Sequence, residues 1–239
     1  MKFSLCIPMY NEAAIIADTA KTLAAYMAEH FSDYEILFSN DGSTDDSAAI
    51  VSALDLPCVR VVGYDKNQGK GAAVRAAVLA STGDIVMFTD ADLAYGTDVI
   101  LRVAKAFEEN PQADAVIGSR NLCKDGYEDY TLIRKLASKT YIKLLCLVGG
   151  LSLSDSQCGC KAFRGEIARK IFSHCEVNGF AFDFEAIMIG TRLGARFFEL
   201  PVKVINHRES KIHIFSDAIK MMKDLRLMKK RVAKLNLDR

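Results

Sequence analysis

Two aspartates directly after an apolar run have the residue type and spacing best suited to chemistry. Asp90 and Asp92 follow the segment DIVMF at positions 84–88. Side chains two residues apart at a strand end can point the same way, so both carboxylates can offer oxygens to one divalent cation. Mg²⁺ or Mn²⁺ bound there would leave coordination positions for a diphosphate and stabilise it as a leaving group. An isolated Asp-x-Asp pair is most often a solvated turn or a helix cap, so the rest of the chain must support this assignment.

Two more polar segments stand where earlier strands are expected to end. IPMYNE follows the apolar run FSLCI, and NDGSTDD follows YEILF. An aromatic ring can stack on a base, and a carboxylate can accept hydrogen bonds from ribose hydroxyls or ring N–H groups. We predict that these segments hold a nucleoside, with Asn11 and Ser43 left open between nucleotide binding and helix capping. The candidates are Pro8, Tyr10, Asn11, Glu12, Asp41 and Ser43.

The segment KNQGKGAAVRAAV superficially suggests a phosphate loop. Five residues separate Gly63 from Gly69, one more than a Walker motif has, and Gly71 stands where that motif needs Ser or Thr, so we reject an ATPase. Gly69 and Gly71 still permit close backbone approach at the start of a helix. Lys70 is then either a ligand of a diphosphate or a solvated lysine in the first turn.

The elements that must position these residues alternate along the first half of the chain. Short β-branched runs alternate with amphipathic stretches at 12–30, 44–54 and 71–81. This rhythm predicts βαβ units, a mainly parallel sheet, and polar motifs gathered at the carboxyl ends of its strands. Ser43 or Thr44 is expected to cap the second helix. The later elements are predicted as a helix at about 182–193, a strand pair around 195–205 and a basic C-terminal helix.

Length and composition restrict the class of protein. The 239 residues, 50% of them hydrophobic, suit a single α/β domain with a substantial core. The 31 Lys and Arg residues nearly balance the 30 Asp and Glu residues, which argues against nucleic acid as a partner.

Seven cysteines without CxxC spacing predict reduced, packed thiols instead of a zinc site. We find neither signal-peptide features nor the roughly 20 apolar residues of a membrane span, and so expect a cytoplasmic protein.

Eight motifs together resemble those of a known family. IPMYNE, NDGSTD, NQGKG, DAD, GSR, DSQCGCKAF, FDFE and PVKV...SK occur in the order found in the inverting GT-A glycosyltransferases, and the resemblance spans residues 3–212. Within that family the chain is most similar to polyprenyl- and dolichyl-phosphate hexose synthases. The resemblance implies an α/β GT-A fold, Rossmann-like with a mainly parallel central sheet flanked by helices, over 1–212. Residues 213–239 are expected to form a basic amphipathic helix, as part of the same domain or as a membrane-surface extension.

The resemblance also implies roles for individual residues. Arg120, Gln157, and Asp183 with Glu185 would line the sugar and acceptor side, and Lys211 with its neighbour Ser210 would lie near phosphate. Asp183 is either a general base or a group that orients substrate, and Asp90 is left open between metal, ribose and a cation. The residues assigned to catalysis are Asp183, Arg120, Gln157 and Lys211; those assigned to the nucleotide are Pro8, Tyr10, Asn11, Glu12, Asp41, Ser43, Lys70, Asp90 and Ala91; those assigned to the metal, Mg²⁺ or Mn²⁺, are Asp92 and Asp90.

The implied function is inverting transfer of a hexose from a nucleotide sugar to a polyprenyl phosphate. Relatives that transfer mannose often have Gln two residues after the second metal aspartate, where this chain has Ala94, which favours glucose from UDP-glucose. Two related activities stay open, a polyprenyl-phosphate mannosyltransferase that uses GDP-mannose and a transferase for a soluble glycan acceptor. A regulatory protein that binds a nucleotide sugar without turnover is the non-enzymatic alternative.

Two basic amphipathic segments bear on how a lipid acceptor would be reached. Apolar and basic residues are interleaved at 132–151 and again at 219–237. Such segments suit anionic headgroups, so we predict peripheral binding to the cytoplasmic face of a membrane. The alternative for 219–237 is a helix that packs one face on the domain.

Overall fold

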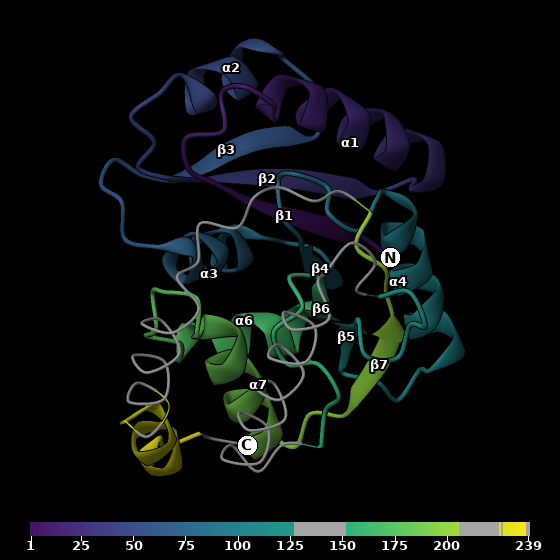
Figure 1. The fold of residues 1–239 in the computed structure, drawn as a ribbon, viewed down its shortest axis with the longest axis vertical. Coiled ribbons are helices and arrows are strands. Elements are labelled where there is room, and N and C mark those ends of the chain that lie inside the picture. Colours follow the sequence, from purple (N-terminus) through teal and green to yellow (C-terminus); the bar gives the residue numbers. More distant parts are fainter. Residues whose placement is uncertain (127–151, 206–224, 226, 238–239) are drawn as a thin grey trace.

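The computed structural model describes residues 1–126, 152–205, 225 and 227–237. Within these residues the backbone forms a seven-stranded sheet with the strand order β3-β2-β1-β4-β6-β5-β7 (Figure 1). The strands are β1 (Phe3–Met9), β2 (Tyr34–Asp41), β3 (Val59–Tyr64), β4 (Ile85–Phe88), β5 (Ala115–Ser119), β6 (Lys161–Arg164) and β7 (Phe197–Pro201).

Strand β6 runs opposite to its two neighbours. The pairs β1–β2, β1–β4, β2–β3 and β5–β7 are parallel, whereas β6 is antiparallel to both β4 and β5. Phe88, which ends β4, is in register with Lys161, which begins β6. The loop before β6 therefore reaches the edge of the sheet that the loops after β4 and β5 also reach. The mainly parallel sheet predicted from the sequence is confirmed. The strand pair predicted around 195–205 is wrong, because this segment contains the single strand β7, which pairs with β5.

Helices cover both faces of the sheet (Figure 1). One hydrophobic cluster contains α1 (Ile16–His30), α2 (Ser47–Ala53) and α4 (Asp98–Glu109), and the other contains α3 (Lys70–Ala80), α6 (Gly165–Ser173) and α7 (Phe182–Arg192). Strand residues alternate between the clusters, since Leu5 and Ile7 belong to the first and Cys6 to the second. A sheet buried on both faces explains the continuous apolar runs at the strand positions.

Three helix starts differ from the sequence prediction. α1 begins four residues after the predicted start and α2 three residues after it, whereas α3 begins one residue early. The prediction that Ser43 or Thr44 caps α2 is wrong, because its N-cap is Asp46 and makes no side-chain cap bond. The loop contacts its neighbour instead, since Thr44 N donates to Asn11 Oδ1 at 2.8 Å. A contact between loops has replaced the local cap.

The described end of the chain packs on α7. Residues 225 and 227–234 are helical, and Leu225, Met228 and Val232 are buried in the second hydrophobic cluster. Arg231 forms ion pairs with Glu185 on α7 and with Glu176. The apolar face of this helical stretch is therefore used for packing. Residues 213–224, 226 and 238–239 of the predicted C-terminal helix, and all of 132–151, lie outside the described residues.

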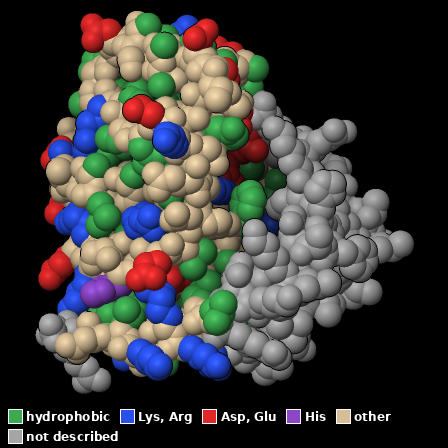
Figure 2. Space-filling view, turned by 90° about the vertical axis from the view of Figure 1, so that its left-hand side faces the viewer, with side chains coloured by type: hydrophobic (Ala, Val, Ile, Leu, Met, Phe, Trp, Pro, Cys, Tyr) green, Lys and Arg blue, Asp and Glu red, His purple; other side chains and the backbone are tan. Residues whose placement is uncertain are grey.

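The described surface mixes charges of both signs. Figure 2 shows Lys and Arg side chains interspersed with Asp and Glu over one face of the molecule, as the net charge of +1 leads one to expect. Among the helices of the described residues, none is long and apolar enough to cross a membrane.

Glu35 ties together the ends of the strands opposite the candidate site. Ser4 Oγ donates to Glu35 Oε1 at 2.6 Å, Thr82 N donates to the same oxygen at 2.6 Å, and Arg60 Nη2 donates to Oε2 at 3.1 Å. Burial raises the pKa of Glu35, but these hydrogen bonds together outweigh burial and lower the pKa from 4.5 to about 2.

Glu35→Gln tests this contribution through the pH dependence of stability. A carboxyl whose pKa falls on folding adds stability above its unfolded pKa, and this stability is lost as the pH falls from 4.5 towards 2. A shift of this size corresponds to about 3 kcal/mol. Urea unfolding at pH 7 is expected to show that loss in Glu35→Gln, with a shallower fall in stability between pH 5 and 2. The exposed Glu29→Gln serves as the control, and equal pH slopes in all three proteins would contradict the prediction.

Candidate active site

Hydrogen bonds join the loops that follow β1 and β2. Asn11 N donates to Ser43 Oγ at 3.1 Å, and Glu12 N donates to Ser47 Oγ at 2.8 Å. Asn11 has a φ of +54°, a conformation that Asn tolerates better than most residues. Tyr10, directly before it, is 45% exposed. Four predicted nucleoside ligands thus lie together at the carboxyl edge, and their binding to a nucleoside stays a prediction.

Asp41 organises the loop that leads into α3. Its buried carboxylate accepts hydrogen bonds from Tyr64 Oη at 2.8 Å, Asn67 Nδ2 at 3.0 Å, Gln68 N at 2.9 Å and Gly69 N at 3.0 Å. Burial and the bond to Asp41 raise the pKa of Tyr64, which keeps the hydroxyl protonated as a donor. Asp41 is a predicted nucleoside ligand. In this structure its carboxylate oxygens bind the protein's own loop before α3.

The first turn of α3 touches the loop that precedes α7. Gly71 N donates to Asn178 O at 2.7 Å, and a Cβ at Gly71 would lie 2.5 Å from Val177 O. Gly69 has a φ of +111°, and a Cβ there would lie 2.5 Å from Asn178 O. The close approach predicted for these glycines is made by the chain's own backbone. It fixes the turn that carries Lys70.

Asp90 and Asp92 lie just beyond β4, and each has a contact within the protein. Lys70 Nζ forms an ion pair with Asp90 Oδ1, and Ala94 N donates to Asp92 Oδ1 at 3.1 Å. Burial alone would lower the pKa of Lys70, but the carboxylates of Asp90, Asp183 and Asp92 outweigh burial and raise it. The structure thus brings four residues predicted from the sequence into one cluster, with a charged ammonium among three carboxylates.

The two carboxylates beyond β4 suit a cation that a diphosphate helps to hold. Within the described ranges there is no group of three or more His, Cys, Asp or Glu side chains able to hold a metal ion. Mg²⁺ commonly binds through one or two carboxylates and completes its coordination with phosphate oxygens and water. Asp90 and Asp92 fit that pattern, whereas a closed zinc site would require more ligands from the protein.

A buried ion pair lies behind this cluster. Lys161 has a fully buried side chain, and its Nζ donates to Asp183 Oδ1 at 2.8 Å and to Cys158 O. The same Nζ lies 5.9 Å from the centroid of the Phe88 ring. Burial raises the pKa of Asp183, and the charges of Lys161 and Lys70 oppose that rise. Asp183, in the first turn of α7, is thereby tied to β6.

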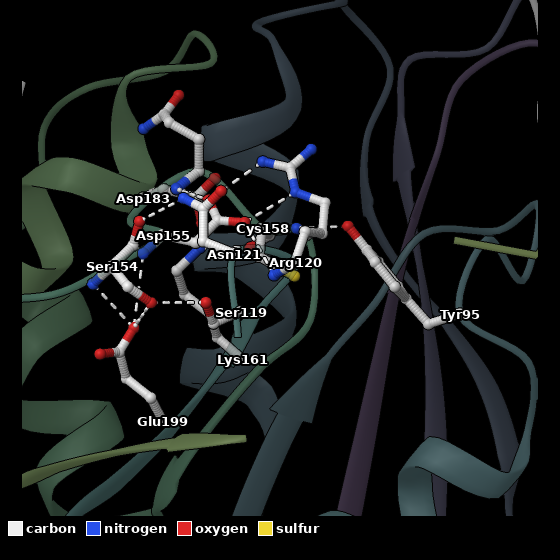
Figure 3. A network of polar contacts seen from close by, with 12 residues as sticks. Tyr95, Ser119, Arg120, Asn121, Ser154, Asp155, Cys158, Lys161, Asp183 and Glu199 are labelled. Carbon is white, nitrogen blue, oxygen red and sulfur yellow. Dashed lines mark hydrogen bonds and ion pairs between the residues drawn. The ribbon is translucent and has the colours of Figure 1, made fainter. Parts of the chain in front are cut away.

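A second buried carboxylate, Asp155, holds Arg120 (Figure 3). Arg120 donates to it from Nε at 2.7 Å and from Nη2 at 3.0 Å, a two-point contact that fixes the guanidinium plane. Gln157 N donates to Asp155 Oδ1 at 3.1 Å. Burial would lower the pKa of Arg120, but its bonds to Asp155 outweigh burial and raise it. Arg120 is therefore a fixed positive charge beside Gln157.

Glu199 on β7 accepts hydrogen bonds from the loop that precedes β6 (Figure 3). Ser154 donates to Glu199 Oε1 from its backbone N at 2.9 Å and from Oγ at 2.6 Å. The Ser119 and Ser154 hydroxyls lie 2.6 Å apart, and Asn121 Nδ2 donates to Ser154 O at 2.6 Å. The loop is thus attached both to β7 and to the end of β5.

The remaining predicted site residues are Ala91, Pro8, Lys211 and Ser210. Ala91 is buried, and its carbonyl accepts a hydrogen bond from Thr19 on α1 at 2.8 Å. Pro8 lies within β1. Lys211 and Ser210 lie outside the described residues.

Three charged residues of these networks were not singled out from the sequence, namely Asp155, Lys161 and Glu199. Lysine inside the apolar run CGCKAF is a signal that could have indicated a buried, paired charge. Asp155 begins the motif DSQCGCKAF, which contains this run. Glu199 lies in an ordinary strand, and its sequence carries no such signal.

Comparison with models of known protein families identifies the family of this chain. The model of glycosyl transferase family 2 matches residues 4–172. The chain belongs to glycosyl transferase family 2. A dolichyl-phosphate beta-glucosyltransferase of Trichomonas vaginalis is 33% identical over 231 residues, which cover 92% of this chain and 68% of the relative. One from Saccharomyces cerevisiae is 29% identical over 241 residues, with coverage of 93% and 72%.

Solved structures agree with the fold of this family 2 transferase. One is a glucosyl-3-phosphoglycerate synthase from Mycobacterium tuberculosis, crystallised with Mn²⁺, UDP-glucose and glycerol 3-phosphate. It aligns with a TM-score of 0.70 and 19% sequence identity, and the alignment covers 98% of this chain and 81% of the synthase chain. At this identity the likeness concerns the fold alone. The GT-A fold implied by the sequence motifs is confirmed.

Lys161→Met tests the buried ion pair of this transferase. Removing the ammonium leaves the Asp183 carboxylate buried and unpaired, which typically costs about 3–5 kcal/mol. The loss is expected to be larger at pH 8 than at pH 5, because an unpaired buried carboxylate is least unfavourable when protonated. Urea unfolding at both pH values measures it.

The double variant Lys161→Met with Asp183→Asn is expected to recover part of this stability, since neither side chain of the pair is then charged. Lys105→Met, exposed on α4, is the control for loss of a lysine. A single variant as stable as the wild type would show that the pair contributes nothing.

Proposed function

We propose that this family 2 transferase moves glucose from UDP-glucose to a polyprenyl phosphate, with inversion at the anomeric carbon. The observation that carries the proposal is the likeness, over 92% of the chain, to a dolichyl-phosphate beta-glucosyltransferase. The carboxyl edge of the sheet supports it, because fixed cations and carboxylates lie side by side where a charged donor and a charged acceptor would meet.

The donor is proposed to lie across the strand ends. Its nucleoside would bind over the loops after β1 and β2, where Tyr10 can stack on a base and Glu12 can accept from ribose hydroxyls. Lys70 would bind the diphosphate, helped by the positive end of α3. Asp92 and Asp90 would hold Mg²⁺ or Mn²⁺, which as a Lewis acid stabilises departing UDP. A fold neighbour crystallised with Mn²⁺ and UDP-glucose supports this choice of ligands.

The acceptor sets a different requirement. A phosphate is already ionised at neutral pH, so the reaction needs no general base, and the main task is to bring two anions together. Arg120 supplies a fixed positive charge, and we propose Lys211 as the second. Asp183 then acts by positioning, since its bond to Lys161 holds it as a carboxylate that can orient a sugar hydroxyl.

A lipid acceptor places the reaction at a membrane surface. We propose that the protein binds there peripherally, on the cytoplasmic face. The outward side of the C-terminal helical stretch supports this, because Leu227, Lys230 and Lys234 are exposed there.

Glycolipid formation tests the proposed reaction. The enzyme is incubated with UDP-glucose, UDP-galactose or GDP-mannose, with Mg²⁺ or Mn²⁺, and with or without polyprenyl phosphate in anionic vesicles. We expect glucolipid and UDP only with UDP-glucose and the lipid together. Asp92→Ala is expected to lower kcat/KM at least 100-fold, since it removes a ligand of the cation at the leaving group. Asp18→Ala, on the exposed side of α1, should match the wild type.

Each other outcome identifies an alternative. Mannolipid from GDP-mannose would establish a mannosyltransferase, and UDP release that ignores the lipid but needs a soluble glycan would establish a soluble acceptor. UDP-glucose binding without any transfer would leave a regulatory protein. Failure of the protein to sediment with the same vesicles would contradict the proposed membrane binding.

Lys70→Met separates binding of the cation from binding of the nucleotide. The ammonium competes with a cation for Asp90 but attracts the diphosphate. We therefore expect the affinity for Mn²⁺ alone, measured by electron paramagnetic resonance, to rise about tenfold and the affinity for UDP-glucose, measured by calorimetry, to fall about tenfold. Changes of the same sign in both affinities would contradict the proposed role.

A further inference from the structure

Two buried amide atoms beside Asp155 have no hydrogen-bond partner. In the part of the chain that the structure describes, three buried side-chain atoms lack one, namely Asn121 Oδ1, Gln157 Nε2 and Ser39 Oγ. Buried polar atoms in native proteins almost always have partners, so each exception needs a reason. Asn121 Oδ1 is an acceptor and Gln157 Nε2 is a donor. They belong to the adjoining loops after β5 and before β6.

The surroundings hold the Asn121 amide and the backbone of Gln157 in place. Asn121 donates from Nδ2 to Ser154 O at 2.6 Å, which sets the orientation of its amide and leaves Oδ1 unpaired. Gln157 donates from its backbone N to Asp155 Oδ1 at 3.1 Å. Ser154 and Asp155 are themselves anchored in the polar network of Figure 3. Groups fixed in this way bind a ligand without first having to be ordered.

The strand order places these amides beyond the diphosphate. The loops with the proposed nucleoside ligands follow β1 and β2, Asp90 follows β4, and β6 and β5 come next across the sheet. Gly159, two residues after Gln157, packs so closely on Asp90 that a Cβ there would lie 2.5 Å from Asp90 Oδ2. A nucleotide sugar laid across this edge, with its diphosphate at Asp90, has its hexose on the side of β6 and β5.

Hydroxyl groups match one acceptor and one donor. A hydroxyl can donate to Asn121 Oδ1 and accept from Gln157 Nε2, and neighbouring hydroxyls of one hexose can each take one partner. An ionised phosphate matches less well, because it offers no donor to Asn121 Oδ1. The family resemblance already assigns Gln157 to the sugar and acceptor side. We propose that Asn121 joins Gln157 in binding hydroxyl groups of the donor hexose, and that Asn121 helps to determine which hexose is transferred. This inference rests on the nucleotide-sugar donor of the proposed function.

Gln157→Met removes Nε2 and preserves the backbone bond to Asp155. Because an unpaired buried donor disappears, we expect a Tm equal to or above that of the wild type, together with a kcat/KM for UDP-glucose about tenfold lower. Asn121→Leu should lower kcat/KM by a similar factor. Ser119→Ala is the matched control, since it removes a hydrogen bond to Ser154 and leaves both amides intact. It should keep the wild-type preference among donors.

Donors that each lack one hydroxyl identify the contacts. The kcat/KM is measured for UDP-glucose and for its 2-, 3-, 4- and 6-deoxy analogues with the wild type and each variant. Where a side chain binds a given hydroxyl, the wild type is expected to discriminate against the matching analogue and the variant to lose that discrimination. Undiminished discrimination at every position in both variants would overturn the inference.

Binding measurements keep this inference separate from the proposed function. Calorimetry compares UDP with UDP-glucose, and the added affinity of the glucosyl group is expected to fall in both variants but not in Ser119→Ala. A wild type that binds UDP-glucose no more tightly than UDP would overturn the inference. A wild type whose glucosyl increment depends on both amides, but which forms no glucolipid, would support the inference and overturn the proposed transfer.

Discussion

The candidate site depends on a lysine whose side chain is entirely buried. An ammonium removed from water needs a carboxylate and further hydrogen-bond acceptors beside it, because an unpaired buried charge costs a large part of the net stability of a domain. For Lys161 these partners are Asp183 on α7 and the carbonyl of Cys158 before β6. One charge therefore fixes α7 and the loop before β6 against the end of β4. Gly159 of that loop packs on Asp90. The buried contacts of Lys161 therefore help to position the carboxylates proposed for the cation.

A second series of contacts runs from the C-terminal helical stretch to the first turn of α3. Arg231 pairs with Glu185 on α7, and the other oxygen of Glu185 accepts a hydrogen bond from Val177 N at 2.8 Å. The same loop touches the backbone of Gly71, which adjoins Lys70. The loop that touches Gly71, next to Lys70, is thus held through Glu185 by Arg231 of the C-terminal helical stretch. The C-terminal helical stretch and Lys70, the residue proposed to bind the diphosphate, are therefore linked by the same few bonds.

The sequence predicted the features that follow from local patterns. Apolar runs that end in polar loops indicate the edge of the sheet and assign both Asp90 and Lys70 to it, and the structure joins these two residues in an ion pair. The start of α2 was missed because Thr44 binds the neighbouring loop, a contact between distant segments. The burial of Lys161 was missed for the same reason, since it depends on Asp183 in another element. Strand β6 itself was not predicted, and a strand of four residues carries no pattern that distinguishes parallel from antiparallel pairing.

The reversed direction of β6 is what allows the edge to hold more than a nucleotide. In a wholly parallel sheet, the loops that follow the strands form the carboxyl edge, and the segment before each strand lies at the opposite edge. Because β6 is antiparallel to β4 and β5, the loop before it reaches their carboxyl ends. Asp155 can therefore hold Arg120 at the end of β5 while Gly159 packs on Asp90 after β4. A parallel strand in this position would carry Asp155, Gln157 and Gly159 to the other edge of the sheet, and Arg120 would lose the carboxylate that holds it.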